Sequence, residues 1–269
     1  MRAVRVAAGL ICIGFAACFF PDLGALSGND AGPDGASDAT ANDAAVNDAA
    51  MNDASADAGP CAAQHVFCDD FDDGPLGAKW DSPYLTDGGA LGLTTVHAVT
   101  APSALAATAA QTGPSVEGEA ELQKLLPAAD HTRVQADVTV AAGASVSELD
   151  MIALIPKPPP PGSDYADFDI QLGKTTGYLE QYVHDTDGGE SSQDLAVDAS
   201  FAATRHVVLD VDFPSQTYAL AIDGVPIQTM TLNPPMPKSP LELDVGIAYI
   251  ESSQGTWTVF VDDVVVDQW

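Results

Sequence analysis

Two neighbouring stretches of the chain, residues 165–172 and 177–184, alternate polar with apolar side chains. Successive side chains of a β-strand point to opposite faces, so each stretch predicts a strand with one polar face. That face carries Tyr165, Asp167 and Asp169 from the first strand and Tyr178, Glu180, Tyr182 and His184 from the second. Carboxylates hydrogen-bond sugar hydroxyls and tyrosine rings stack on sugars, which predicts a carbohydrate-binding surface. The alternative is the solvated outer face of any half-buried sheet.

A second group of acidic residues stands near the two ends of the predicted domain. If the first and last strands are neighbours, the carboxylates of Asp70, Asp72, Asp262 and Asp263 converge. Ca²⁺ takes about six to eight oxygen ligands and would relieve their repulsion, so we expect a structural calcium ion here. The alternative is a set of independent turn-forming and solvated aspartates, since no contiguous calcium-loop pattern occurs.

The chain has four cysteines, and two of them, Cys61 and Cys68, stand close together at the start of the predicted domain. In an exported protein this pair is expected to form a disulfide. A metal-binding pair is the alternative. It is disfavoured because the sequence has no second Cys or His pair with the spacing of a zinc site.

The N-terminus reads as an export signal. Arg2 and Arg5 precede an apolar run over residues 6–20, which is shorter than the roughly 20 residues of a membrane span. Residues 15–18, Phe-Ala-Ala-Cys, resemble the bacterial lipobox, so residues 1–17 form the predicted signal peptide and Cys18 the lipidated residue. We expect anchoring to the cell envelope, at the outer membrane, through the lipid only. The alternative is an ordinary cleaved signal and a secreted protein.

Residues 18–60 form a predicted disordered linker, because the segment from Ser27 to Pro60 is built almost entirely of Ala, Asp, Asn, Gly, Ser and Thr. The folded domain is then expected over residues 61–269. The chain carries 39 acidic and 9 basic residues, a net charge of −30. Such a surface repels phosphate backbones and excludes nucleic acid as a partner, whereas cations, neutral sugars or cationic partners suit it. Solubility alone is the other explanation of the charge.

The domain is predicted to be all-β. Alternating segments rich in Val, Ile, Thr, Leu and Tyr recur between turn-forming clusters, and the sequence shows no convincing amphipathic helix. This pattern of short alternating segments predicts a two-sheet antiparallel sandwich of the jelly-roll type. The clearest predicted strands are Arg133–Val140, Glu148–Ile155, Tyr165–Leu172, Gly177–His184, His206–Phe213, Tyr218–Asp223, Pro226–Leu232, Leu241–Ile250 and Trp257–Asp267. Weaker strand patterns are found at Gln64–Phe67, Leu91–Val96, Ser103–Ala109 and Gly118–Leu125.

Several of these segments resemble the concanavalin A-like lectin/glucanase superfamily, in particular its LamG-like jelly-roll domains. The resemblance is carried by Phe67–Gly74 with the following Trp80, by Val207–Asp212 and Tyr218–Gly224, and by Trp257–Val266. It implies two antiparallel sheets, one of them concave, with the first and last strands side by side, sugar bound or cut on the concave sheet, and often a structural calcium ion. Together with the lipobox and the linker, the domain is similar to surface lipoproteins of myxobacteria-like organisms.

Laminarinase-like members of this superfamily carry a Glu-x-Asp-x-(x)-Glu motif on a concave strand, with the first Glu as nucleophile and the last as general acid. Glu148 and Asp150 match the first two acids, but Ile152 or Ala153 takes the place of the last. Loss of the proton donor costs about 10²–10⁴-fold in rate, so no catalytic residue is assigned. Replacement of that acid by Asp167, Asp169 or Glu180 from a neighbouring strand remains open.

The leading hypothesis is therefore an envelope-anchored, noncatalytic recognition domain that binds carbohydrate through residues 148–184. A glycan-cleaving enzyme with an atypical acidic site is the second hypothesis. The third is a structural or adhesive module whose partner is a surface protein.

Overall fold

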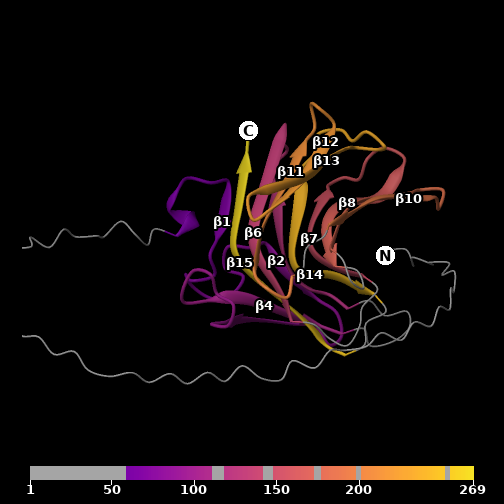
Figure 1. Ribbon diagram of the computed structural model, residues 1–269. Coiled ribbons are helices and arrows are strands. Elements are labelled where there is room, and N and C mark those ends of the chain that lie inside the picture. Colours follow the sequence, from indigo (N-terminus) through magenta and orange to yellow (C-terminus); the bar gives the residue numbers. More distant parts are fainter. Residues whose placement is uncertain (1–58, 111–117, 142–147, 173–176, 198–200, 252–254) are drawn as a thin grey trace, which may run out of the picture. The chain divides into compact units, whose positions relative to one another are not determined.

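The computed structural model describes residues 59–110, 118–141, 148–172, 177–197, 201–251 and 255–269 (Figure 1). Within them the chain forms two antiparallel sheets and one short 3₁₀ turn, η1 (Pro60–Ala62). This confirms the predicted all-β sandwich. The predicted signal peptide, the lipidation site Cys18 and nearly all of the linker lie outside the described residues.

Sheet A holds eight of the strands, with β15 near its centre. In spatial order it contains β13 (Val225–Thr231), β12 (Thr217–Ile222), β11 (Arg205–Asp212), β6 (His131–Ala141), β15 (Trp257–Gln268), β4 (Ala104–Ala109) and β3 (Ala90–Thr94), with β1 (Phe67–Asp69) paired to the end of β15. Cys68 of β1 lies opposite Val265 of β15, so the first and last strands are neighbours, as predicted. Figure 1 shows β1 alongside β15.

Sheet B holds seven strands and carries most of the residues that the sequence singles out. In spatial order it contains β10 (Glu190–Val197), β9 (Gly177–Asp185), β8 (Ser163–Leu172), β7 (Glu148–Pro156), β14 (Leu241–Glu251), β5 (Ala120–Leu126) and β2 (Ser82–Leu85). Strands β7, β8 and β14 therefore lie side by side, although β14 is separated from the other two by more than 60 residues of chain.

The hydrophobic core lies between the two sheets. Strand β6 shows why: Val134, Ala136 and Val138 are buried, while the residues between them are partly exposed. Strand β8 contributes its apolar set, Phe168 and Ile170, to the same core. Trp80 and Trp257 are also buried there. Burial of these apolar surfaces is the main force that holds the two sheets together.

Candidate functional site

The face of sheet B that points away from the core collects acidic and aromatic side chains from five strands. On β8 and β9 the core side takes Phe168, Ile170, Leu179 and Val183. Because side chains alternate, the opposite face takes their neighbours in the sequence. We define the acidic face by its six carboxylates: Glu121 of β5, Asp150 of β7, Asp167 and Asp169 of β8, Glu180 of β9 and Asp244 of β14.

One row of this face runs straight across five strands. Glu180 is the register partner of Asp169, and Asp169 is the partner of Ala153. Ala153 in turn lies opposite Asp244, which lies opposite Gln123. Directly opposite side chains have Cβ atoms about 4.5–5.5 Å apart, and like charges in such positions repel. The Glu180–Asp169 pair therefore places two buried carboxyl groups side by side on this row.

A second row carries the tyrosines. Tyr182 lies opposite Asp167, and the hydroxyl of Tyr165 donates a hydrogen bond to Oδ2 of Asp167 at 2.6 Å. The rings of Tyr165 and Tyr182 have centroids 6.2 Å apart at an interplanar angle of 52°. Tyr165 also packs against a small apolar cluster on the same face, made of Ala153, Ile155 and Ala248. Aromatic rings, an apolar cluster and carboxyl groups thus share one face of sheet B, on which Tyr165 is partly exposed and Tyr182, the apolar cluster and the six carboxyl groups are buried.

A β-bulge in β14 adds residues that the sequence does not single out. The register between β14 and β7 shifts between Val245 and Tyr249, which places Tyr249 opposite Asp150. Gly246 lies inside the bulge at φ 128°, where a Cβ atom would stand 2.5 Å from the carbonyl oxygen of Ala120. Asp244, Tyr249 and Glu121 were missed by sequence reasoning. Alternation along β14 signals Asp244, since Leu243 and Val245 are core residues, whereas the bulge leaves no comparable signal.

The structure also places the partial glucanase-like motif. Asp150 lies on the acidic face and Ile152 points into the core. A register shift between these two residues, in the pairing of β7 with β8, turns Ala153 toward the acidic face. Ala153, and not Ile152, therefore occupies the place of the last acid. Its partners on both sides, Asp169 and Asp244, are carboxylates.

The remaining predicted ligand-binding residues lie on or near this surface. Glu148 begins β7 and is partly exposed. Tyr178 is the register partner of Gln171, and the position of its side chain lies outside the described part of the structure. His184 lies at the other end of β9, where Nδ1 is paired with the carboxylate of Asp164. Apart from Tyr178, the predicted residues thus lie on one face of sheet B, with His184 at its rim.

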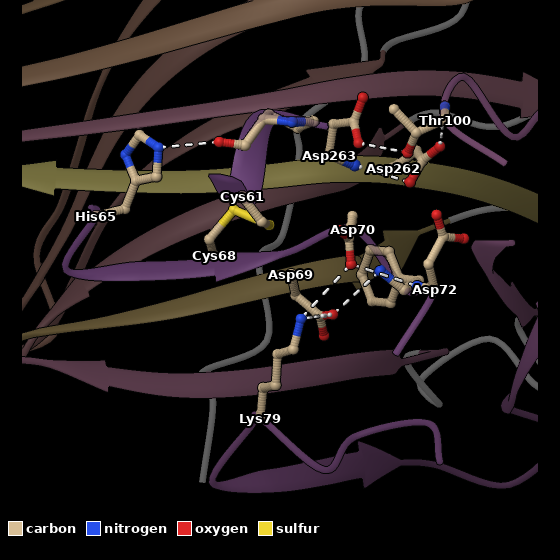
Figure 2. The surroundings of a disulfide bond; sticks show 12 residues. Cys61, His65, Cys68, Asp69, Asp70, Asp72, Lys79, Thr100, Asp262 and Asp263 are labelled. Atoms are coloured by element: carbon tan, nitrogen blue, oxygen red, sulfur yellow. Dashed lines mark hydrogen bonds and ion pairs between the residues drawn. A yellow bond between two sulfur atoms is a disulfide. The ribbon is translucent and has the colours of Figure 1, made fainter. Parts of the chain in front are cut away.

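The second acidic group lies where β1 meets β15, next to a disulfide between Cys61 and Cys68 (Figure 2). The predicted disulfide is confirmed, with the two Cα atoms 5.5 Å apart. Within the disulfide loop, His65 directs Nδ1 to Asp267 at 2.8 Å and Nε2 to the carbonyl oxygen of Pro60 at 3.1 Å. These contacts fasten the loop to β15.

Several of the predicted calcium ligands accept hydrogen bonds from the protein itself. Oδ2 of Asp262 accepts from the backbone N–H groups of Val99 and Thr100, at 2.7 and 3.0 Å. Oδ1 of Asp263 accepts from the Thr100 hydroxyl at 2.7 Å, and Oδ1 of Asp72 accepts from the Ser103 N–H at 2.7 Å. Figure 2 shows Asp262, Asp263 and Thr100 together. These carboxylates therefore hold the loop before β4 in place.

Charges in this group also act on one another. Burial, together with the neighbouring Asp263, raises the pKa of Asp262 to about 7, despite the three backbone N–H groups that favour its ionised form. Burial likewise raises the pKa of Asp263, and the carboxylates of Asp137, Asp70 and Asp72 add to the effect. The two β15 aspartates hence resist ionisation.

Among the described residues, no three His, Cys, Asp or Glu side chains are arranged to hold a metal ion. Asp70 and Asp69 also lie 3.5 and 3.3 Å from the ammonium group of Lys79, which supplies positive charge to this group. Calcium at Asp70, Asp72, Asp262 and Asp263 stays a prediction. In the part of the chain that the structure describes, no helix is long and apolar enough to cross a membrane.

Comparisons with known proteins relate the domain to solved structures only. No protein-family model matches the sequence, and no curated protein does. An endo-β-1,4-glucuronan lyase from the fungus Trichoderma reesei matches with a TM-score of 0.59 and 16% identity, over 77% of this chain and 96% of the lyase chain. A cellulose-induced protein matches with a TM-score of 0.56 and 15% identity, over 74% and 96% of the two chains.

A glycoside hydrolase family 16 endo-glucanase from Bacteroides ovatus, solved in complex with an oligosaccharide derivative, matches with a TM-score of 0.51. It is 10% identical to this protein, over 75% of this chain and 99% of the glucanase chain. These likenesses confirm the predicted concanavalin A-like jelly-roll fold. At such identities they show the fold alone.

Proposed function

We propose that the protein binds carbohydrate on the acidic face of sheet B without cleaving it. The observation that carries the proposal is that Tyr165, Tyr182 and Tyr249 share one face of sheet B with carboxyl groups from five strands, and that Tyr165 packs on the apolar cluster of that face. Tyrosine rings offer apolar faces to sugar rings, and carboxylate oxygens accept hydrogen bonds from hydroxyl groups. The names of the structural neighbours support this proposal, since a glucuronan lyase and an endo-glucanase both act on glycans.

The proposal is tested by isothermal titration of the full chain with hexasaccharides: cellohexaose, laminarihexaose, xylohexaose and N-acetylchitohexaose. We expect at least one to bind, and Tyr182→Ala to weaken that binding about tenfold, which corresponds to about 1.4 kcal/mol. Trp269→Ala is the control, because it removes a ring that is 60% exposed beyond the end of β15, in sheet A. Absence of binding to every glycan would refute the proposal.

Glycan cleavage is the second candidate, and the position of Ala153 favours it. A hydrolase needs a proton donor near the leaving group. Asp169 and Asp244 both lie directly opposite Ala153, so these two carboxyl groups are the candidates for the role of the missing acid. Release of reducing ends from a polysaccharide, abolished by Glu148→Gln, would identify an enzyme. If neither binding nor release occurs, a structural or adhesive module with a protein partner is left.

Export and lipid anchoring through Cys18 form a separate proposal, supported by the N-terminal pattern alone. Growth with a fatty-acid analogue should label the wild-type protein and leave Cys18→Ser unlabelled. A labelled Cys18→Ser variant would remove the anchor from the proposal. The sugar-binding proposal does not depend on the result.

A further inference from the structure

We infer that His65 is a protonation-dependent clasp on the disulfide loop, residues 61–68. As an imidazolium ion, its ring fastens this loop both to the end of β15 and to η1, whereas the neutral ring holds only one of the two. The clasp lies where β1 meets β15, outside the acidic face, and is independent of the proposed sugar binding. Figure 2 shows His65 together with the Cys61–Cys68 disulfide.

Both nitrogens of the His65 ring face hydrogen-bond acceptors. Nδ1 lies 2.8 Å from Oδ1 of Asp267, and Nε2 lies 3.1 Å from the carbonyl oxygen of Pro60. Neither a carbonyl oxygen nor an ionised carboxylate has a proton to donate. A neutral imidazole has one N–H and can make only one of these bonds, whereas an imidazolium ion has two and makes both. The side chain is 15% exposed, so water does not readily replace a lost partner.

The groups around the ring come from the elements packed against the loop. Asp267 of β15 faces the ring, and Arg133 of β6 is the register partner of Asp267. Nε and Nη2 of Arg133 donate hydrogen bonds to the carboxylate of Asp210, at 2.7 and 3.0 Å, so Asp210 holds the guanidinium group and His65 takes Oδ1 of Asp267. From η1 the uncharged Pro60 carbonyl faces the ring, and Cys68 of β1 is bound in the disulfide.

Loss of the second proton should release Pro60 rather than Asp267. The bond to the carboxylate is the shorter of the two and is charge-assisted, so the remaining proton stays on Nδ1. Nε2 then presents a lone pair to the Pro60 oxygen 3.1 Å away, and two acceptors at this distance repel each other. The contact with η1 therefore opens while the contact with β15 persists.

The clasp matters because little else fastens this part of the chain. The disulfide joins the two ends of the loop, and residues 62–64 between them are exposed. The N–H of Val66 donates to the carbonyl oxygen of Val266 at 3.0 Å, and β1 adds only three register pairs with β15. Histidine changes its charge between about pH 5 and about pH 8. The loop should therefore be closed at the acidic end of this range and loosened at the other.

The test measures hydrogen exchange of the full chain at residues 60–69, at about pH 5.5 and about pH 8, with each rate corrected for the exchange of an unfolded peptide at the same pH. Protection of this segment should fall about tenfold between the two, because a hydrogen bond to a charged ring is lost. Peptides from β12 should show no such change. Long-range ¹H–¹⁵N spectra should show both ring nitrogens of His65 protonated at the lower pH and Nε2 without a proton at the higher.

Two matched variants separate this ring from the other histidines. His65→Gln keeps a polar side chain that does not titrate, so its segment should exchange at the lower pH as the wild type does at the higher, with no further change. His206→Gln is the control, because His206 lies in β11, is 41% exposed and has a carboxylate partner, Asp137, at 3.2 Å. It should retain the full response. The ring spectra of the wild-type protein give a reading that does not require either variant to fold.

Each other outcome overturns the clasp in a recognisable way. A single proton on the His65 ring at the lower pH overturns the imidazolium ion, and protection that does not change with pH overturns the fastening. A response of equal size in His65→Gln assigns it to another group. Loss of the response in His206→Gln assigns it to the overall charge of the protein. A proton that stays on Nε2 at the higher pH overturns Pro60 as the released partner.

Discussion

Asp262 illustrates how a single carboxyl group makes the stability of the domain depend on pH. It is 1% exposed and its pKa is raised to about 7, with burial as the main cause and Asp263 as the second. In the unfolded chain the ordinary value of 3.8 applies. Between pH 3.8 and about 7, Asp262 therefore keeps a proton in the folded protein that it has released in the unfolded chain.

By linkage, this group stabilises the domain below about pH 4, and the contribution is lost as the pH rises toward 7. We expect the free energy of unfolding, measured by urea titration with EDTA present, to fall by roughly 2–4 kcal/mol over that range. Asp262→Asn should flatten the slope. Because Asn also changes the hydrogen bonds to Val99 and Thr100, slopes are compared rather than absolute stabilities.

Asp212 serves as the control for this measurement. The backbone N–H of Ser215 lowers its pKa, so its effect on stability has the opposite sign and is lost as the pH falls. Asp212→Asn should alter the free energy of unfolding at the acid end of the pH range. The slope of that free energy against pH should stay unchanged above pH 5. If the slope of Asp262→Asn runs parallel to that of the wild type, Asp262 is not the group responsible.

Asp69 is a second buried carboxylate, and it holds neighbouring groups in place through hydrogen bonds. It accepts hydrogen bonds from the Trp80 indole at 2.7 Å and from the Phe71 N–H at 3.1 Å, and Lys79 stands 3.3 Å away. Asp69→Ala leaves these donors unsatisfied, so we expect a loss of about 2–4 kcal/mol in unfolding free energy. Asp73→Ala, at an exposed position nearby, should change stability by less than about 0.5 kcal/mol. Similar losses in both variants would argue against this role of Asp69.

At the scale of single residues, alternation along the sequence predicts which side chains of β8 and β9 share a face. It does not predict Tyr249, because the bulge around Gly246 changes the register of β14. Nor does it predict that Asp244 stands opposite Ala153, since the pairing of β7 with β14 brings together residues far apart in the chain. Register between distant strands is set by tertiary packing, which one sequence does not reveal.

Among the elements, the bulge of β14 is the one on which the acidic face depends. Gly246→Ala would force a side chain into a φ of 128° and within 2.5 Å of the Ala120 carbonyl oxygen. We expect a loss of about 2–4 kcal/mol in stability, measured by urea unfolding. Gly92→Ala in β3, where a Cβ atom meets nothing within 4 Å, is the matched control. A stable Gly246→Ala variant would show that the bulge is not strained as described.

The disulfide loop before β1 gives a prediction about reduction. Closing this short loop restricts the unfolded chain, and replacing both cysteines with serine should cost about 2–3 kcal/mol. Thermal unfolding of the double variant and of the wild type, with and without reductant, measures the effect. The double variant should not respond to reductant. If the wild type does not respond either, the bond contributes little.

The sequence predicts some strands of the structure well and others not at all. Strands with clear alternation, such as β6, β8 and β15, were found with nearly the right bounds. Two edge strands were missed for physical reasons: β2 is four residues long, fully exposed and contains Pro83, and β10 begins with a polar run, Glu190–Asp194. Edge strands bury little apolar surface, so their sequences carry a weak signal.

At the scale of the whole molecule, the net charge of −30 makes cations the natural ligands to test. If calcium binds near Asp70, Asp72, Asp262 and Asp263, about 1 mM Ca²⁺ should raise the melting temperature relative to EDTA, because a ligand that binds only the folded state stabilises it. Mg²⁺ controls for general screening of charge. Asp263→Asn should remove the difference between the two ions. Equal melting temperatures in Ca²⁺ and EDTA would exclude the predicted site.

The position of β15 has a consequence for biosynthesis. This strand pairs with β1, β4 and β6, so the middle of sheet A is filled by residues 257–268, which are made after all other described strands. A ribosome-bound chain that still lacks these residues has a gap between β4 and β6 and leaves β1 without its partner. The middle of sheet A can form only when the last strand has emerged, so the growing chain stays open until its synthesis is nearly complete.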